Sequence, residues 1–297
     1  MDRAIIIGTF GFLGYSICRA MLDEGVEVNA IPVGEEPDCF IEEKRMEIGR
    51  NANFCEEEVR ILNEWKGEAL IPVIIPFFDF YLMGMEEKLF ENYFLQEELF
   101  SLPPEKFPII LLIPEQLEYD GTSKFEPLVN LKQNLTKKGF LLKEVLVPTL
   151  YGPWQPEGCF FQQILSLGVE AVTFPSLNSR ESTSDAIYVA DAATIVRDLL
   201  EEARSGKYVM RSGKKSGWCK CLESIYYTLL KSKELGEEKK SWENELKNMM
   251  KLRAPLNQEQ KLSEDYRRVY VQKPMDTLEG LEQQRKQYLR LLKGKHD

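Results

Sequence analysis

The sequence predicts an α/β protein built on a doubly wound parallel sheet, with a smaller α/β lobe towards the C-terminus. An N-terminal strand runs through a glycine turn into a helix, and strand-like and helix-like segments then alternate over the first 150 residues. The inner strand segments are almost continuously apolar, as strands buried on both faces of a parallel sheet are. A chain of 297 residues is large for one core, so we expect a second lobe.

The first strand, turn and helix have the spacing of a phosphate-binding unit. Residues 3–7 (RAIII) read as a strand, residues 15–23 as a helix and residues 26–31 as the next strand. In such units the glycines allow a tight turn, close approach of a pyrophosphate and close helix packing, while the helix N-terminus presents free N–H groups. We therefore predict a Rossmann-like cofactor loop made of Gly8, Thr9, Phe10, Gly11, Phe12, Leu13 and Gly14. The alternative is an ordinary strand–helix turn that binds nothing.

The rest of the sheet follows from periodicity. Residues 37–54 are polar and irregular. Apolar residues at near-helical spacing predict helices over residues 56–66, 86–100 and 125–138, the last ended by Gly139. Apolar, β-branched and aromatic runs predict strands over residues 70–78, 107–113 and 140–147. In the last third, residues 231–253 and 278–292 read as helices.

Composition excludes several classes of function. A net charge of −10 argues against nucleic-acid and anionic-membrane partners, which need a basic surface. No secretory signal is visible, and the longest apolar run, residues 69–85, is too short and broken to span a membrane. The six cysteines lack paired CxxC spacing, so we expect no metal site, no disulfide framework and a cytoplasmic location. The sole histidine, His296, lies at the end of the chain, which excludes histidine-dependent catalysis.

Three later segments add specificity: residues 146–156 (LVPTLYGPWQP), 184–193 (SDAIYVADAA) and 276–281 (DTLEGL). With the glycine turn, they resemble the extended short-chain dehydrogenase/reductase family, the NAD-dependent epimerase/dehydratase group, over nearly the whole chain and in the same order. The matching family motifs are TGxxGxxG, the YGP loop, the fvyVdDva segment and the sleeGL helix start.

The resemblance carries expectations about organisation and ligands. It implies a dinucleotide-binding domain of residues 1–150 and 185–205, and a substrate-type lobe of residues 151–184 and 206–297. It also implies NAD or NADP as cofactor, a nucleotide sugar as a further ligand, and a homodimer.

The sequence departs from the family at the catalytic position. The family places a tyrosine four residues before a lysine, and the matching stretch here is Asp120-Gly121-Thr122-Ser123-Lys124. Asp120 occupies the tyrosine position, while Tyr119 lies five residues before Lys124, which turns it about 100° further round a helix. The candidate catalytic residues are Lys124, Tyr119 and Asp120, and Lys124 is also a candidate for holding the nicotinamide ribose. Upstream, Pro114-Glu115-Gln116 lacks the hydroxyl that the family carries there.

The residues expected to contact the cofactor also differ from those of the family. Pro32 stands where a charged side chain usually reads the adenosine ribose. No arginine lies close to the end of that strand, which favours NAD over NADP. Residues 77–80 (FFDF) replace the small residues that follow the fourth strand of the family, and their rings could lie in the space of the cofactor.

Three functions remain open, and whether the chain is an enzyme is undecided. The missing tyrosine favours an epimerase-like Rossmann protein without Tyr–Lys redox catalysis, acting as a module that binds a nucleotide, a nucleotide sugar or a partner. A second hypothesis is an active NAD(P)-dependent nucleotide-sugar epimerase, dehydratase or reductase that uses Tyr119 or Asp120 with Lys124. A third is an assembly partner whose nucleotide cleft is filled by Phe10, Phe12 or Phe77.

Overall fold

The computed structural model describes residues 1–33, 40–56, 69–92, 94–118, 125–166, 174–231, 239–253 and 265–294. The chain divides into two compact units, each built from interleaved segments. The first comprises Met1–Val147, Ala193–Met210 and Leu262–Val269, and the second Pro148–Ala192, Arg211–Lys261 and Tyr270–Asp297, counting the described residues of each range.

The first unit is built on a sheet in the order β10-β9-β6-β5-β4-β1-β2-β3. Neighbouring strands from β3 to β9 pair in parallel. The strands are β1 (Arg3–Ile7), β2 (Glu27–Ile31), β3 (Phe54–Glu56), β4 (Val73–Ile75), β5 (Ile109–Pro114), β6 (Leu142–Val147), β9 (Gly206–Arg211) and β10 (Arg267–Tyr270). The predicted Rossmann-like fold class is confirmed.

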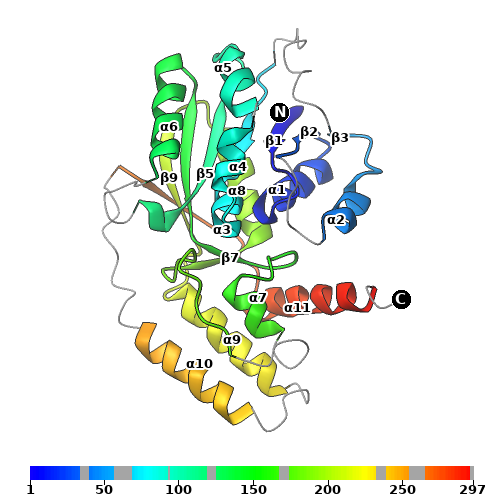
Figure 1. Cartoon of the computed structure of the whole chain (residues 1–297), viewed down its shortest axis with the longest axis vertical. Coiled ribbons are helices and arrows are strands. Elements are labelled where there is room, and N and C mark those ends of the chain that lie inside the picture. The colour runs from blue at the N-terminus through cyan, green and yellow to red at the C-terminus, as the bar shows by residue number, and fades with distance from the viewer. Residues whose placement is uncertain are drawn as a thin grey trace. The chain divides into compact units, whose positions relative to one another are not determined.

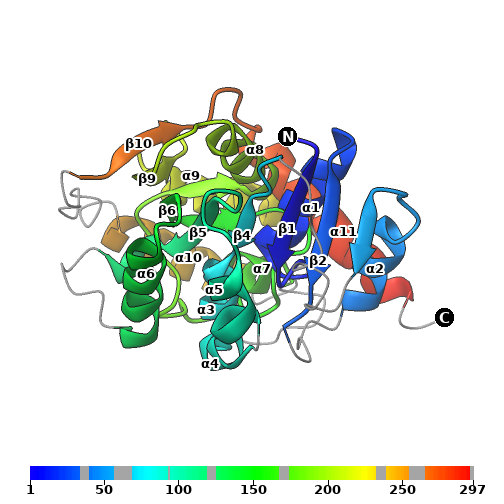
Figure 2. The same cartoon turned by 90° about the horizontal axis from the view of Figure 1, so that it is seen from above.

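Helices cover both faces of this sheet. Figure 2 shows α3 (Phe77–Met83), α4 (Glu86–Glu91) and α6 (Glu126–Lys138) on one face, with α1 (Phe12–Asp23) and α8 (Val189–Leu200) on the other. The shorter elements are α2 (Ile41–Ile48), a π-helical turn (Phe94–Glu98), α5 (Leu99–Ser101) and a 3₁₀ turn (Glu115–Leu117). Because both faces are covered, the apolar side chains of β1, β4 and β5 are 1% exposed or less.

The strand predicted over residues 70–78 is too long at both ends. β4 covers three residues, and α3 begins at Phe77. Pro72 and Pro76 bracket the strand, and neither has an N–H to donate to a longer ladder. The aromatic residues that suggested a strand instead form the buried face of α3.

Two further predictions need correction. Residues 37–54 are not irregular throughout, because they contain α2 and the start of β3. The helix predicted over residues 86–100 is broken, since Asn92 leaves the helical conformation with ψ 125° and a π-helical turn follows. The helix predicted over residues 125–138 is confirmed as α6, and Gly139 ends it with φ +88°. Most of the helix predicted over residues 56–66 lies outside the described residues.

The second unit contains a two-stranded parallel sheet of β7 (Thr149–Tyr151) and β8 (Ala186–Tyr188). Its helices are α7 (Phe160–Leu165), α9 (Gly217–Lys231), α10 (Lys239–Arg253) and α11 (Thr277–Gly294), labelled in Figure 1. Trp218 stacks on Phe160 at a centroid distance of 5.9 Å in its core. The helix predicted over residues 278–292 is confirmed as α11. Of the helix predicted over residues 231–253, α10 covers the part from Lys239, Lys231 ends α9, and residues 232–238 lie outside the described residues. No helix in the described residues is long and apolar enough to cross a bilayer.

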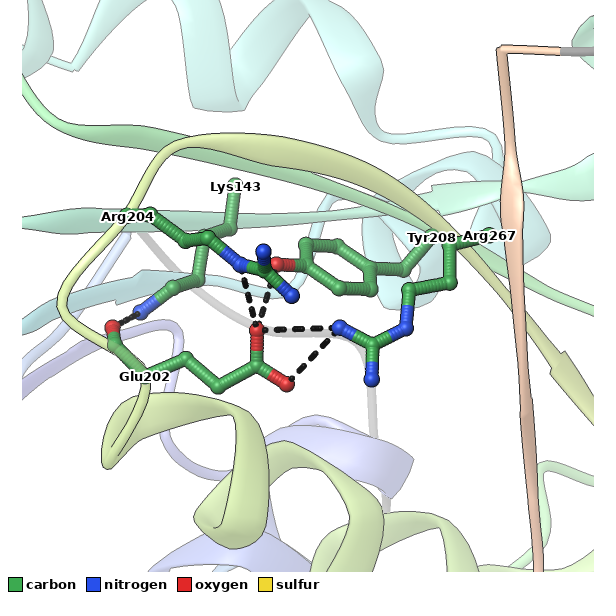
Figure 3. Close-up of polar contacts among 5 residues, drawn as sticks. All are labelled: Lys143, Glu202, Arg204, Tyr208 and Arg267. Atoms are coloured by element: carbon green, nitrogen blue, oxygen red, sulfur yellow. Dashed lines mark hydrogen bonds and ion pairs between the residues drawn. The ribbon is translucent and has the colours of Figure 1, made fainter.

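A charge cluster ties β6, β9 and β10 together at the amino end of β9 (Figure 3). The Glu202 carboxylate accepts hydrogen bonds from Tyr208 at 2.8 Å and from Arg204 and Arg267 at 3.4 Å. Lys143 donates to the Glu202 carbonyl at 2.5 Å. Burial alone raises the pKa of Glu202, but the bonds from Tyr208 and Arg204 and the charge of Arg267 outweigh it and hold this pKa below its ordinary value.

We predict that Glu202→Gln lowers the free energy of unfolding by about 1 kcal/mol at pH 7. A carboxyl whose folded pKa is depressed stabilises the fold above its unfolded pKa of about 4.3, and this contribution disappears as pH falls through the folded value. Melting temperatures of wild type and variant between pH 3 and 7 should therefore converge at the acid end. The neighbouring exposed Glu201→Gln is the matched control, and a wild-type-to-Glu202→Gln gap independent of pH would contradict the assignment.

Candidate functional site

The predicted phosphate-binding residues come together at the carboxyl end of β1. Gly11 is the N-cap of α1, and every residue from Gly8 to Gly14 except Gly11 is buried. Gly8 has φ +69°, a conformation that favours glycine, and its N–H donates to the Ile31 carbonyl at 2.8 Å. The loop geometry that the sequence predicts is therefore present.

A carboxylate from α3 binds the first turn of α1. Asp79 Oδ1 accepts the Leu13 N–H at 2.9 Å, and Oδ2 accepts the Gly14 N–H at 2.8 Å. These donors have no partner within their own helix, and Gly11 has no side chain to cap them. Asp79 is only 4% exposed, so the contact is shielded from water. Hydrogen bonds to a charged group contribute roughly 1.5–3 kcal/mol each, and the positive end of the helix dipole adds to them.

The sheet explains how Asp79 reaches this position. β4 lies beside β1 in parallel register, with Ile5 opposite Val73 and Ile6 opposite Ile74. Both strands therefore end at the same edge, where the glycine loop follows one and α3 follows the other. The sequence of residues 77–80 predicts rings near the space of the cofactor, whereas the contact to α1 is made by the Asp79 carboxylate.

The three glycines make room for other parts of the protein. A Cβ on Gly8 would overlap the tip of the Phe80 ring, and a Cβ on Gly11 would lie 2.5 Å from Asp79 Oδ2. A Cβ on Gly14 would lie 2.8 Å from the Gly8 carbonyl oxygen. Thus the places where a ligand would approach Gly8 and Gly11 are filled by α3. The sequence predicts Phe10, Phe12 or Phe77 as the ring that fills the cleft, whereas the ring against Gly8 is that of Phe80. The Phe77 ring packs against Phe90 and Phe125 in the core.

The far side of the loop is fixed by α2. Lys44 is fully buried, and its Nζ donates to the Phe10 carbonyl at 2.7 Å. The Arg45 guanidinium lies 4.9 Å from the centre of the Phe10 ring. Thr9 Oγ1 donates to the Ile6 carbonyl at 3.0 Å, so this hydroxyl is used within the loop.

This arrangement does not fit a dinucleotide diphosphate. Two of the N–H groups that would bind phosphate already bind Asp79, and Phe80 covers Gly8. A diphosphate beside the carboxylate would also be repelled, by about 4 kcal/mol per pair of unit charges at 4 Å and an effective dielectric constant of 20. Among the described residues, no group of three His, Cys, Asp or Glu side chains is placed to hold a metal ion.

The candidate catalytic residues Tyr119, Asp120 and Lys124 lie outside the described residues. The segment before them is described: β5 ends at Pro114, and Glu115 begins a 3₁₀ turn with its side chain fully buried. A buried carboxyl group therefore stands where the resembled family has a hydroxyl.

The remaining motif residues hold the second unit together. Asp191 Oδ2 accepts the Met275 N–H at 2.9 Å, and Lys214 Nζ donates to Thr277 Oγ1 at 2.8 Å. Burial raises the pKa of Asp191, and the Met275 N–H and the Lys214 charge partly offset this increase. Gly280 sits against the rings of Tyr151 and Tyr188, where a Cβ would lie 3.0 and 2.9 Å from them.

A buried glutamine joins α11 to α7 and the loop after β7. Gln284 Oε1 accepts the Gly152 N–H at 2.8 Å, and its Nε2 donates to Gln155 at 2.7 Å and Gln162 at 2.8 Å. Nearby, burial raises the pKa of Glu181 to about 7, partly offset by the hydrogen bond it accepts from the Phe160 N–H. These contacts give the motif of residues 146–156 a packing role within the second unit.

Sequence comparison finds one distant relative. No family model matches the chain. The uncharacterized protein YjaV of Bacillus subtilis strain 168 is 26% identical over 163 residues, which cover 53% of this chain and 66% of YjaV. The match thus spans just under two thirds of that relative's length.

Comparison with solved structures identifies the fold over almost the whole chain. The UDP-glucuronic acid 4-epimerase of Bacillus cereus, in complex with NAD, matches with a TM-score of 0.62 and 12% identity over 98% of each chain. The dTDP-glucose 4,6-dehydratase of Bacillus anthracis, also in complex with NAD, matches with a TM-score of 0.60 and 13% identity over 98% of this chain and 97% of that one. This chain therefore has the fold of NAD-dependent epimerases and dehydratases.

We predict that Gly11→Ala destabilises the protein by roughly 1–3 kcal/mol, because the added methyl group would overlap the Asp79 carboxylate. In a double-mutant cycle with Asp79→Ala, the two changes should couple by about 0.5–3 kcal/mol, since the second removes the atoms that the first strikes. Chemical denaturation of the four proteins measures this coupling.

Gly158→Ala is the matched control, since a Cβ there meets nothing within 4 Å. Additive effects of Gly11→Ala and Asp79→Ala would show that Gly11 is not needed to accommodate the carboxylate.

Proposed function

We propose that this chain is a divergent relative of the epimerase/dehydratase group that works as a binding module without Tyr–Lys hydride chemistry. The observation that carries this proposal is the Asp79 carboxylate on the Leu13 and Gly14 N–H groups. A chain that supplies its own anion to the glycine loop has no need of a cofactor diphosphate there.

The other departures support the same function. Asp120 stands at the tyrosine position, the segment after β5 carries buried Glu115 instead of a hydroxyl, and Pro32 follows β2 where a ribose-reading side chain is usual. Asn92 Nδ2 donates to the Pro32 carbonyl at 3.4 Å, so that carbonyl is used within the protein. The ligand on this proposal is a partner protein or a nucleotide that binds without the glycine loop. No disulfide joins the described cysteines, which suits a reducing cytoplasm.

Titration with NAD⁺, NADH, NADP⁺ and NADPH tests the proposal. We expect no saturable heat in calorimetry and no rise in melting temperature up to millimolar cofactor, with sodium chloride of equal ionic strength as control. A ligand at 100 times its dissociation constant would add about 2.7 kcal/mol of stability, which such a scan detects readily. Micromolar binding of any of the four would overturn the proposal.

A second candidate is an active NAD(P)-dependent enzyme acting on a nucleotide sugar. It is supported by the Ser123-Lys124 pair in the sequence and by neighbours of this fold that were solved with NAD, one of them also with UDP-glucuronic acid. On this hypothesis Lys124 holds the ribose, and Tyr119 or Asp120 transfers the proton.

The two candidates differ in the outcome of a turnover assay on nucleotide sugars with added cofactor. The binding-module proposal predicts no turnover by the wild type. The enzyme hypothesis predicts turnover that falls by a factor of at least about 100 in Lys124→Ala and in the Tyr119→Phe/Asp120→Asn double variant. Wild-type turnover that survives both variants would exclude these residues as the catalytic group.

A further inference from the structure

We propose that Asp79 and Phe80 form an internal ligand of the glycine loop, which takes the place of a nucleotide diphosphate and selects against phosphate-bearing cofactors. This inference rests on the proposed function and names the residues that determine its specificity. It predicts that removing one carboxylate turns the loop into a phosphate-binding site.

The carboxylate makes the contacts that a phosphate would make. Two anionic oxygens accept two backbone N–H groups, at 2.9 Å from Leu13 and 2.8 Å from Gly14. A helix N-terminus favours either anion for the same reason, through free donors and the dipole. The Asp79 side chain is nearly fully buried, so a phosphate must displace it in order to bind the same donors.

The carboxylate is held in place by α3 and not by a loose loop. The Asp79 N–H donates to the Pro76 carbonyl at 3.0 Å, which fixes the first turn of α3 directly after β4. At the other end, Gly84 with φ +68° closes the helix, and the Met85 N–H donates to the Phe80 carbonyl at 2.8 Å. Movement of the Asp79 backbone away from α1 would therefore require rearrangement of the packed helix.

The Phe80 ring blocks the approach of a ligand to Gly8. The ring is 5% exposed and lies where a side chain on Gly8 would be. Gly8 and Gly11, which in nucleotide-binding loops allow a cofactor to come close, here allow Phe80 and Asp79 to come close. The close approach of Phe80 and Asp79 therefore explains the glycine spacing without a cofactor.

The experiment compares wild type with Asp79→Ala, using inorganic pyrophosphate and ADP-ribose as probes in calorimetry and thermal-shift titration. We expect no binding by the wild type up to 10 mM. The variant should melt at a lower temperature, and either probe should raise that temperature saturably. Its dissociation constant should lie at least tenfold below the 10 mM limit set for the wild type. Glu87→Ala, which removes one exposed negative charge from the first turn of α4, is the matched control and should behave as wild type.

A second measurement applies if Asp79→Ala fails to fold. Asp79→Asn keeps the shape of the side chain and removes its charge. Amide exchange of Leu13 and Gly14, followed by NMR, should then be at least tenfold faster than in wild type, and pyrophosphate should shift these two resonances in the variant alone. Unchanged exchange and unchanged resonances would overturn the inference.

The outcomes separate the two proposals. Micromolar binding of NAD(P) by the wild type would overturn the proposed function and this inference together. Absence of binding by wild type, by Asp79→Ala and by the Asp79→Ala/Phe80→Ala double variant, which also removes the ring against Gly8, would overturn the internal ligand alone and leave the binding-module proposal standing.

Discussion

The parallel pairing of β1 with β4 is the constraint on which the candidate site depends. It brings the carboxyl ends of the two strands to the same edge of the sheet, with Ile6 opposite Ile74. The glycine loop leaves one strand and α3 leaves the other, so residues far apart in the sequence meet there. The Asp79 carboxylate and the Leu13 N–H, 66 residues apart, form their hydrogen bond because this register places them together.

The first turn of α1 sets the chemical requirement at that edge. Its N–H groups need an acceptor, and Gly11 at the N-cap provides none. In a dinucleotide enzyme the cofactor supplies that acceptor, so the loop is complete only when the cofactor is bound. In this protein α3 supplies it, and α2 secures the opposite side through the buried Lys44. The fold is thus shared with NAD-dependent enzymes, whereas the acceptor for the glycine loop comes from within this protein.

The sequence predicted the features that depend on local pattern. Glycine spacing after a buried strand located the loop, and continuous apolar runs located β1 and β5, because burial on both faces leaves a strong signal. The apolar and aromatic pattern of residues 70–78 predicts one strand, because aromatic residues favour strands. Phe77 and Phe78 instead belong to α3, because their packing depends on tertiary contacts. The role of Asp79 could not be predicted, because it depends on the register between β1 and β4.

In the second unit, the motifs predict which residues matter but not the contacts that these residues make. Gly280 was found from its helix-start motif, yet its reason, the rings of Tyr151 and Tyr188, becomes visible only in three dimensions. Gln284, which joins α7, α11 and the loop after β7, carries no sequence signal, since nothing distinguishes it from other glutamines on a helix. A motif can therefore identify a fold while the residues that secure it remain hidden.

We expect the glycine loop to bind its own carboxylate in preference to a dinucleotide. A crystal structure of the wild-type protein grown in 10 mM NAD⁺ would show which of the two occupies the loop. We predict Asp79 on the Leu13 and Gly14 N–H groups, Phe80 against Gly8, and no diphosphate in the loop. A diphosphate bound to those N–H groups, with α3 displaced, would contradict it.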